Sequence, residues 1–539
     1  MKLSIENYQW LQKCRSVYGR SPRVLHIGNI ANNAYNNAKL LNEAGLDCDV
    51  ICYDYYHTMG CPEWEDADFC GDYGDPFRPD WKRVDLKEFQ RPEWFAQGPF
   101  AICQQYLVAK RTQSPMTENY RIVSLASSLC VEASAMISSY SKYIFLLLNL
   151  RRRIAELLRY LKNKAKRYPS ILKIYRKIYF LFTYINIYDR LAAFKHRRFI
   201  LGLSRQYQAE FPKKTDHIQY LDICGYFGVI DKWSELLSNY DYVIAYSTDP
   251  ILPLLCKREY FAFEHGTIRE IPYENTSRGK LAALAYRKAA HVFVTNIDCV
   301  ASAEFLAPGR FTTINHPYDE DHGQSVFGWE KLRTDLLVEL DSEFIFFHPT
   351  RQDWVAGTGY ADKNNEIFLN AFIELRRNGY KIGLVCCEWG SNVAESKQLL
   401  KDADCDTFVK WTSPLAIIPF ERMCLASDII VDQFKLGAFG GVLFKAMAVG
   451  RPILTYLDEE QISRQYPECP PVINCRTKEE IVAAMTNLVS SSKRIKELGC
   501  SSREWIKKHH SKSSVVNAQI DQFRLLEKRF SRKHNKAFK

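Results

Sequence analysis

The stretch DIIVDQFKLGAFGGVLFKAMAVGRPILTY, residues 428–456, predicts a strand, a glycine-rich loop, a helix and a second strand in that order. Its first apolar run ends in two polar residues, and three glycines precede the helical segment. Glycines allow a sharp turn, and the N-terminus of the helix offers unpaired N–H groups to an anion. The stretch is therefore either an anion-binding β-α-β unit or a β-α-β turn without a ligand. The residues expected to line this site are Asp432, Gln433, Gly437, Gly440 and Gly441.

Strand patterns alternate with helical patterns on both sides of this unit. Such alternation is typical of parallel sheets, in which a helix connects each strand to the next. The sequence predicts the α/β class: two Rossmann-like parallel-sheet domains that face a cleft, with ligands at the carboxyl ends of the strands. The expected strands are 23–29, 48–54, 240–247, 260–266, 291–296 and 311–317 in the first domain, and 343–350, 381–388, 407–411, 428–433, 451–456 and 471–475 in the second.

The chain is expected to divide at a run of turn and polar residues. Residues 1–325 are predicted to form the N-terminal domain, 326–505 the C-terminal domain, and 506–539 a C-terminal helix with a basic tail. Residues 55–115 are rich in Pro, Gly, Trp and Asp, and we expect long loops with little regular structure there. Residues 120–215 interleave apolar and basic side chains at helical spacing, which predicts a basic helical insertion in the N-terminal domain.

The charge of the chain is concentrated in one segment. The formal net charge is +11, but residues 151–200 hold fifteen Lys or Arg and two acidic residues, which is +13. The other 489 residues hold 58 basic and 60 acidic side chains, which is −2. This distribution argues against a nucleic-acid-binding surface over the whole chain and for a local anionic partner.

The composition is that of a globular protein without disulfides. Of 539 residues, 47% are hydrophobic and 25% are charged, which excludes collagen-like, coiled-coil and largely disordered chains. The 17 cysteines are an odd number without zinc-type C-x-x-C spacing, and the first residues lack the apolar core of a signal peptide. We therefore expect free thiols in the reducing cytosol. No apolar run reaches the roughly 18–20 residues of a membrane-spanning helix.

Two motifs follow expected strands of the first domain. The segment GNIANNAY, residues 28–35, opens a helix, and its amides and free N–H groups suit a sugar hydroxyl, unless the asparagines only cap the turn. In FEHGTIRE, residues 263–270, the imidazole of His265 lies at the edge of the cleft, unless it is a structural histidine. The residues expected to contact the sugar or acceptor are Gly28, Asn29, Asn32, Asn33, Tyr35 and Arg269.

Two cations lie near the first strand of the second domain. Arg351 directly follows the strand, and Lys363 stands just before a helical pattern. Two cations at the mouth of a cleft can neutralise a diphosphate, one as a planar fork and one as a point charge. The alternative is a pair of solvated surface charges.

The order and spacing of these motifs resemble those of nucleotide-sugar glycosyltransferases of the GT-B fold, in particular the retaining family 4 branch. The segment AMAVGRP is similar to the end of that family's E-A-M-A-x-G-x-P signature, and the resemblance covers about residues 20–115 and 215–525. It implies that the C-terminal domain holds a nucleotide-diphosphate sugar and that the N-terminal domain binds the acceptor. It also implies that Arg351 and Lys363 bind the diphosphate.

The same resemblance gives further residues a role. His265 falls near the donor sugar and is the expected catalytic residue. The two glutamates of the family's E-x7-E pair fall on Gly437 and Lys445, and a lysine cannot accept hydrogen bonds from ribose hydroxyls. Either Lys445 is a donor-binding residue that contacts phosphate, or the chain is a non-catalytic GT-B protein that binds a glycan or partner. A sugar-nucleotide epimerase is a third alternative.

The resemblance implies transfer without a cofactor or a metal, because cations and helix N-termini can stabilise the leaving diphosphate. The D-x-D triplets at 66–68, 402–404 and 404–406 are short enough to arise by chance. The implied reaction moves a sugar from a nucleotide sugar to a hydroxyl of a glycan or lipid-linked acceptor, with retention. Its expected context is the synthesis of cell-surface polysaccharide or glycoconjugate.

The basic insertion has three interpretations: a solvated helical hairpin over the cleft, a membrane-surface helix pair, and a nucleic-acid contact. Lys and Arg beside Tyr, Phe, Ile and Leu suit an anionic lipid interface. We favour an anionic membrane surface as the partner of residues 141–200, because the family resembled often uses lipid-linked acceptors, and we expect no nucleic-acid partner. The expected location is the cytoplasm, peripheral on the inner face of the membrane.

Overall fold

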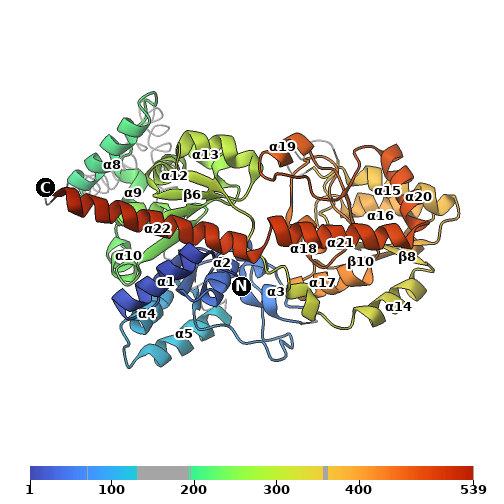
Figure 1. Cartoon of the computed structure of the whole chain (residues 1–539), viewed down its shortest axis with the longest axis horizontal. Helices are drawn as coiled ribbons and strands as arrows, with labels where there is room; N and C mark the ends of the chain where they lie inside the picture. Colours follow the sequence, from blue (N-terminus) through green and yellow to red (C-terminus); the bar gives the residue numbers. More distant parts are fainter. Residues whose placement is uncertain (70, 130–193, 195, 356–361, 538–539) are drawn as a thin grey trace, which may run out of the picture.

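The computed structural model describes residues 1–69, 71–129, 194, 196–355 and 362–537. They form two α/β domains that lie side by side along the long axis of the molecule (Figure 1). The strand order is β3-β2-β1-β4-β5-β6-β7 in the first sheet and β10-β9-β8-β11-β12-β13 in the second. All pairings of neighbouring strands are parallel. The predicted fold of two Rossmann-like parallel-sheet domains is confirmed.

The first domain has helices on both faces of its sheet. Its strands are β1 (Arg23–Ile27), β2 (Asp47–Tyr53), β3 (Phe95–Gly98), β4 (Tyr242–Tyr246), β5 (Phe261–Phe263), β6 (His291–Val294) and β7 (Phe311–Thr313). Its helices are α1 (Ile5–Tyr18), α2 (Asn33–Glu43), α3 (Pro62–Asp66), α4 (Phe100–Arg111), α5 (Thr117–Leu129), α8 (Arg197–Glu210), α9 (Tyr220–Ile223), α10 (Ile230–Leu237), α11 (Ile251–Leu255), α12 (Ser277–Lys288) and α13 (Val300–Leu306).

The second domain repeats this pattern, and two long helices follow it. Its strands are β8 (Phe344–His348), β9 (Ile382–Cys387), β10 (Val409–Thr412), β11 (Ile429–Val431), β12 (Ile453–Thr455) and β13 (Ile473–Asn474). The helices are α14 (Trp329–Glu339), α15 (Asn365–Arg377), α16 (Val393–Asp402), α17 (Ile417–Ala426), α18 (Gly441–Ala448), α19 (Glu459–Ser463), α20 (Lys478–Val489), α21 (Ser492–His509) and α22 (Lys512–Ala537).

Every predicted strand segment overlaps a strand of the structure, and most of these strands are buried on both faces. In β1, for example, Val24 belongs to the core layer on one face of the sheet, and Leu25 and Ile27 belong to the layer on the other. The prediction of long loops with little regular structure at 55–115 is wrong in part, because α3, β3 and α4 lie within it, whereas the described residues between α3 and β3 form no helix or strand. The sequence FAQG of β3 has no β-branched residue, and only its pairing with β2 and its burial make it a strand.

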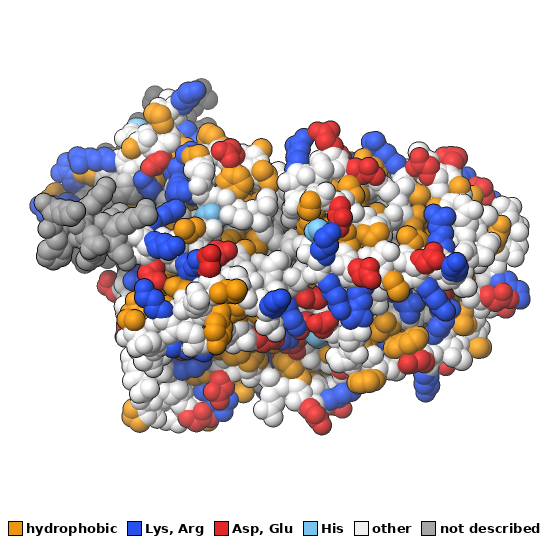
Figure 2. Space-filling view, in the orientation of Figure 1, with side chains coloured by type: hydrophobic (Ala, Val, Ile, Leu, Met, Phe, Trp, Pro, Cys, Tyr) orange, Lys and Arg blue, Asp and Glu red, His pale blue; other side chains and the backbone are white. Residues whose placement is uncertain are grey.

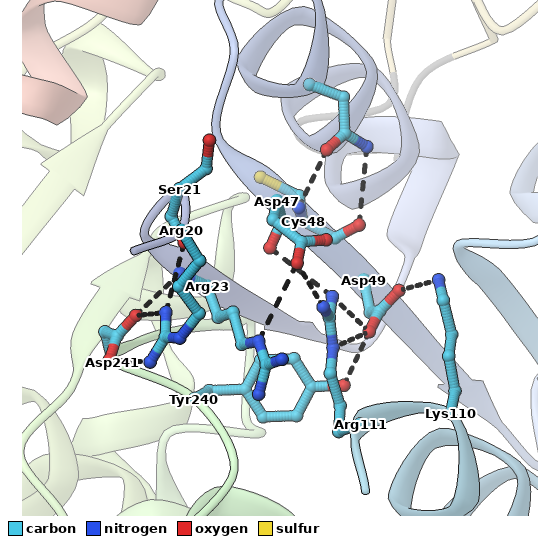
Figure 3. A network of polar contacts seen from close by, with 11 residues as sticks. Arg20, Ser21, Arg23, Asp47, Cys48, Asp49, Lys110, Arg111, Tyr240 and Asp241 are labelled. Carbon is cyan, nitrogen blue, oxygen red and sulfur yellow. Dashed lines mark hydrogen bonds and ion pairs between the residues drawn. The ribbon is translucent and has the colours of Figure 1, made fainter. Parts of the chain in front are cut away.

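A buried ionic network holds the amino ends of β1, β2 and β4 together (Figure 3). The carboxylate of Asp49 is fully buried and accepts hydrogen bonds from Lys110 Nζ at 2.7 Å and Arg111 Nε at 2.6 Å. The hydroxyl of Tyr240 donates to the same carboxylate at 2.7 Å. Arg111 also pairs with Asp47. The network lies at the edge of the sheet opposite the carboxyl ends of the strands.

The last helix returns to the first domain. Helix α21 packs on the second domain through Trp505 and Ile506, and α22 runs along the first domain (Figure 1). The side chains of Ile520 and Phe523 are buried in the first-domain core. Gln519 Nε2 donates to Asn37 Oδ1 at 2.8 Å, between residues 482 positions apart. The C-terminal helices therefore tie the two domains together.

A second contact joins the domains at α3 and α17. Trp64 of α3 belongs to one buried apolar cluster with Ala416 and Ile417 of the second domain. Arg422 Nη2 donates to Asp68 Oδ2 at 2.7 Å. The segment that follows β2 is thus held against the second domain.

The predicted basic insertion falls largely on residues 130–193, outside the described residues, and the described ends of that region belong to α5 and α8. On the described part of the face in Figure 2, charged side chains of both signs are mixed over both domains. Every cysteine that the structure describes is a free thiol, and most are buried. Among the described helices, none has the length and apolarity needed to span a membrane.

Candidate active site

A cavity of about 320 Å³ lies between the two domains at the carboxyl ends of their strands. Arg351 and Trp389 follow β8 and β9, and the indole Nε1 of Trp389 donates to the carbonyl of Pro349 at 2.8 Å. The N-terminus of α18 forms part of the wall. The lining residues are Ala31, Met59, Trp64 and Glu65 from the first domain, and Pro349, Cys387, Trp389, Pro414, Leu415, Ile417, Phe420, Gly441, Val442 and Lys445 from the second.

Cations of both domains converge beside this cavity. Burial lowers the pKa of Lys363, and the positive charges of Arg351 and Arg269 lower it further, against the opposing effect of Asp432. Arg351 lies over the ring of Trp389, with Cζ 5.9 Å from the ring centroid. Arg351 and Arg269 disfavour the charged form of Lys363, and a bound anion would offset this repulsion in addition to the effect of the nearby carboxylates.

Arg269 forms a bidentate pair with Asp298, and Arg351 has a more distant carboxylate neighbour. Lys363 makes no ion pair among the described residues, although burial lowers its pKa against the opposing charges of Asp432 and Asp353. Arg351 Nη1 lies 3.5 Å from Asp353 Oδ2, which is longer than a hydrogen bond. Arg269 Nη2 donates to Asp298 Oδ1 at 2.9 Å. The ammonium of Lys363 makes no hydrogen bond or ion pair within the described part of the chain. Lys363 is therefore the cation with the most capacity left for a ligand.

Asp432 and Gln433 shape the loop after β11. Asp432 Oδ1 accepts a hydrogen bond from the hydroxyl of Thr350 at 2.9 Å, and burial raises the pKa of Asp432. The side-chain oxygen of Gln433 accepts from the backbone N–H of Leu436 at 2.7 Å and of Lys435 at 3.1 Å. These contacts hold the glycine loop against β8 and leave the amide nitrogen of Gln433 for other partners.

The three glycines of the loop differ in their surroundings. Gly437 has φ +64°, and a Cβ there would lie 2.7 Å from Cβ of Asp458. A side chain at this position would require Asp458 or the loop to shift and would strain the backbone. Gly440 precedes α18 as its N-cap, and Gly441 has open space around its Cα.

Lys445 lines the cavity and lies near a stack of rings. Its Nζ is 5.8 Å from the ring centroid of Phe444, whose ring stacks on His316 with centroids 5.6 Å apart. Burial lowers the pKa of His316 far below its usual range, and the charges of His265, His510 and Lys445 add to this effect. His316 is therefore a neutral imidazole between the two halves of the site, and its position was not predicted.

His265 lies at the edge of the first domain that faces this stack. Its Nδ1 is 3.2 Å from Nδ2 of Asn33, and burial together with Arg269 lowers its pKa to about 4. The imidazole is neutral at pH 7 and can take part in hydrogen bonds as donor and acceptor. Glu264, which precedes it, accepts a hydrogen bond from the backbone N–H of Gly266 and holds the turn. The acid directly before His265 was a signal that sequence reasoning passed over.

Most polar side-chain groups of the asparagine-rich turn after β1 form hydrogen bonds within the turn or with neighbouring residues of the first domain. Asn29 Nδ2 donates to the side-chain oxygen of Asn32 at 2.9 Å, and Asn29 Oδ1 accepts from the backbone N–H of Tyr35 at 2.9 Å. The hydroxyl of Tyr35 donates to Asp66 Oδ2 at 2.6 Å. Of the predicted contacts in this turn, Asn33 is the one that the structure brings to His265.

Gly28 lies against Asp249, which sequence reasoning missed. A Cβ at Gly28 would lie 2.1 Å from Asp249 Oδ2, and the φ of +85° also requires glycine. The hydroxyl of Tyr53 donates to Asp249 Oδ1 at 2.5 Å, and burial raises the pKa of Asp249 to about 7. This carboxyl group is half-buried at the carboxyl end of β4, on the acceptor side predicted for the first domain.

The described residues contain no group of three or more His, Cys, Asp or Glu that could hold a metal ion. Of the D-x-D triplet in the first domain, Asp66 pairs with Lys39 at 2.8 Å and Asp68 with Arg422 at 2.7 Å.

No protein-family profile and no curated protein sequence matches the chain. HepE from Anabaena, solved with UDP and glucose, is 14% identical with a TM-score of 0.44, over 56% of this chain and 82% of HepE. Sucrose-phosphate synthase from Thermosynechococcus elongatus is 14% identical with a TM-score of 0.41, over 55% of this chain and 79% of the synthase. A glycosyltransferase from Rickettsia africae is 12% identical with a TM-score of 0.43, over 57% and 82%. At this level the likeness says nothing of a ligand, which has to be inferred from the site.

Proposed function

We propose that the protein is a glycosyltransferase that moves a sugar from a nucleotide-diphosphate donor to a hydroxyl of a glycan or lipid-linked acceptor. The observation that carries this proposal is the convergence of Lys363, Arg351 and Arg269 beside a mostly apolar cavity between two parallel sheets. An apolar cavity suits a base, and adjacent cations suit a diphosphate.

We propose one orientation for the donor in the site. Its base packs among apolar side chains such as Trp389 and Val442, and its diphosphate extends to Lys363 and Arg351. The free N–H groups at the start of α18 lie on the same wall and add to the stabilisation of negative charge. The positive charges offset the charge of the leaving diphosphate, so the proposed reaction needs no metal and no cofactor.

The acceptor approaches from the first domain, where His265, Asn33 and Asp249 lie. In the proposed reaction the bond between the anomeric carbon and the phosphate oxygen breaks, and its electron pair stays on the phosphate. The acceptor oxygen forms the new bond on the same face of the sugar, and its proton passes to the leaving phosphate. Neutral His265 orients the donor sugar or the attacking hydroxyl by hydrogen bonding. Synthesis of cell-surface polysaccharide or glycoconjugate in the cytoplasm is the context we propose.

An anionic membrane surface is the proposed partner of the basic block. Most of residues 141–200 lies outside the described part of the chain, but α8 begins in this block. In α8, exposed Leu201 lies at helical spacing with exposed Arg197, Arg198 and Arg205, and exposed Phe194 precedes the helix. Apolar and cationic side chains on one exposed helix face suit an anionic lipid interface. Co-sedimentation with vesicles of phosphatidylglycerol, with neutral vesicles as control, tests this partner.

Calorimetric titration with UDP, GDP, ADP, dTDP and CMP tests the donor site. We expect one base to bind, and Arg351→Ala to weaken binding about 10- to 100-fold by loss of a charge-assisted hydrogen bond. Binding of none of them to the folded protein would contradict the proposal and favour the non-catalytic alternative. Product analysis with and without acceptor separates transfer from sugar-nucleotide epimerisation, which needs no acceptor.

A further inference from the structure

The cavity between the domains carries two charged side chains, and they come from different domains. Glu65 belongs to α3 of the first domain, and Lys445 belongs to α18 of the second. The other lining residues are apolar or uncharged. Within this lining, Glu65 is thus the carboxylate and Lys445 the ammonium available to a bound molecule.

Glu65 is held in place before any ligand binds. Only 7% of its surface is exposed. Asn36 Nδ2 donates to Oε1 at 2.9 Å, and Asn32 Nδ2 lies 3.4 Å from Oε2. A carboxylate has about four lone-pair sites, so two amide donors leave capacity for further hydroxyl groups. The loss of side-chain entropy on binding is small because the group is already fixed.

The backbone that carries Glu65 is fixed by the other domain. Its neighbour Trp64 is buried in the apolar cluster that includes Ile417 at the start of α17. Three residues beyond Glu65, the chain is held again where Asp68 pairs with Arg422 of the same helix. Packing between the domains therefore fixes the segment that places Glu65 in the cavity wall.

The two charges can recognise different parts of one ligand. Hydroxyl groups need an acceptor for their protons, which Glu65 supplies and an ammonium group cannot. A phosphate needs a donor, which Lys445 supplies. We infer that Glu65 accepts hydrogen bonds from the ribose hydroxyls of the donor nucleotide, and that Lys445 serves its phosphate side; this inference rests on the proposed function.

This assignment makes the donor site discriminate between ribose and deoxyribose. A buried carboxylate that loses a hydroxyl partner on binding a deoxynucleotide is left with unsatisfied acceptor capacity in a desolvated cavity. It also makes nucleotide binding depend on contacts from both domains.

Calorimetry with ribonucleoside diphosphates and their 2′-deoxy counterparts tests the inference on the full-length protein. We expect the wild type to bind the ribonucleotide about 10- to 100-fold more tightly. Glu65→Gln should weaken binding of the ribonucleotide by a similar factor, leave that of the deoxynucleotide unchanged, and so remove the discrimination.

Glu388→Gln is the matched control, since Glu388 is 43% exposed at the end of β9 and pairs with Lys397. Equal melting temperatures of the variants exclude unfolding as the cause. In one outcome, the wild type binds a nucleoside diphosphate and Glu65→Gln binds the ribonucleotide and the 2′-deoxynucleotide with the affinities of the wild type. That outcome overturns the inference and leaves the proposed function standing. If the folded wild type binds no nucleoside diphosphate, both are overturned.

Discussion

His322 is hydrogen-bonded to Glu421 across the junction of the domains, with Nδ1 2.8 Å from Oε2. On its other side, Nε2 lies 3.9 Å from Oδ1 of Asp66, in α3. Burial opposes the charged imidazolium, and Lys39 opposes it too, but the hydrogen bond to Glu421 and the two carboxylate charges outweigh them and raise the pKa of His322. A protonated His322 therefore bridges the two domains.

This geometry predicts that stability falls with rising pH. A histidine whose folded pKa is raised contributes stability that is fully present below the unfolded pKa of about 6.5 and is lost as pH rises through the folded pKa. Replacing His322 by Gln should cost about 1–3 kcal/mol at pH 6 and less at pH 9. Urea unfolding of both proteins at the two pH values measures the difference. A cost that does not change with pH would contradict a charged His322.

Removal of the Asp49 charge should destabilise the first domain strongly. Asp49→Asn leaves Arg111, which is 4% exposed, without its central buried partner. Breaking a buried ion pair by removing one member costs about 3–5 kcal/mol. Chemical unfolding measures the loss, and Glu460→Gln, in an exposed pair with Arg464, should change stability by less than about 1 kcal/mol. Similar costs for the two substitutions would refute the importance of the buried network in Figure 3.

At pH values near the lowered pKa of Lys363, nucleotide binding should take up protons through this residue. Its pKa is lowered in the free protein by burial and by nearby cations, and a bound diphosphate removes that penalty and raises the pKa again. Affinity should therefore fall as pH rises through the lowered pKa of the free protein. Calorimetry in two buffers of different ionisation enthalpy counts the protons. Lys363→Met should abolish the uptake and weaken binding about 10- to 100-fold, whereas Lys397→Met, at an exposed pair with Glu388, should leave both unchanged.

A glutamate at position 437 should not increase the affinity of the site for a nucleotide. Gly437→Glu introduces a Cβ 2.8 Å from the backbone nitrogen of Asp458, at a φ of +64°. We expect a loss of about 1–3 kcal/mol in stability and no gain in nucleotide affinity. Gly441→Ala is the matched control, because no atom lies within 4 Å of its added Cβ, and its melting temperature should stay close to that of the wild type. A stable Gly437→Glu variant with tighter binding would show that the loop can rearrange.

Replacement of His265 should affect transfer more than donor binding. His265→Gln should lower the rate of product formation about 10²-fold, as expected for loss of a group that orients a reacting hydroxyl, and should change the Kd of the donor nucleotide less than threefold. His291→Gln is the control, because His291 is also buried with a pKa lowered to about 4, but lies at the amino end of β6 and bonds Thr312. Equal losses for both variants would point to folding instead of chemistry.

The strand framework could be predicted because buried parallel strands are continuous apolar runs, as in Val24, Leu25 and Ile27. The ends of these strands also carried the positions of Arg351 and His265. Both signals are local in the sequence. The short strand β3 lacked this signal, because its burial comes from neighbours and not from its own residues.

The cavity could not be predicted in the same way. Glu65 lies in the segment that follows β2, well beyond the end of that strand. Its place in the cleft depends on contacts such as that of Asp68 with Arg422, which are 354 residues apart. The internal hydrogen bonding of Asn29, Asn32 and Tyr35 also depends on the fold, since an exposed asparagine and a self-bonded one look alike in a sequence.

The packing of α22 on the first domain has a consequence for biosynthesis. At about 5–20 residues per second, the 482 residues between Asn37 and Gln519 take a ribosome roughly half a minute to a minute and a half to translate. Once β7 ends at Thr313 the first sheet is fully synthesised, and from then until α22 emerges the surface that Ile520 and Phe523 cover is bare. The nascent chain therefore exposes an apolar surface to which chaperones can bind until its last helix emerges.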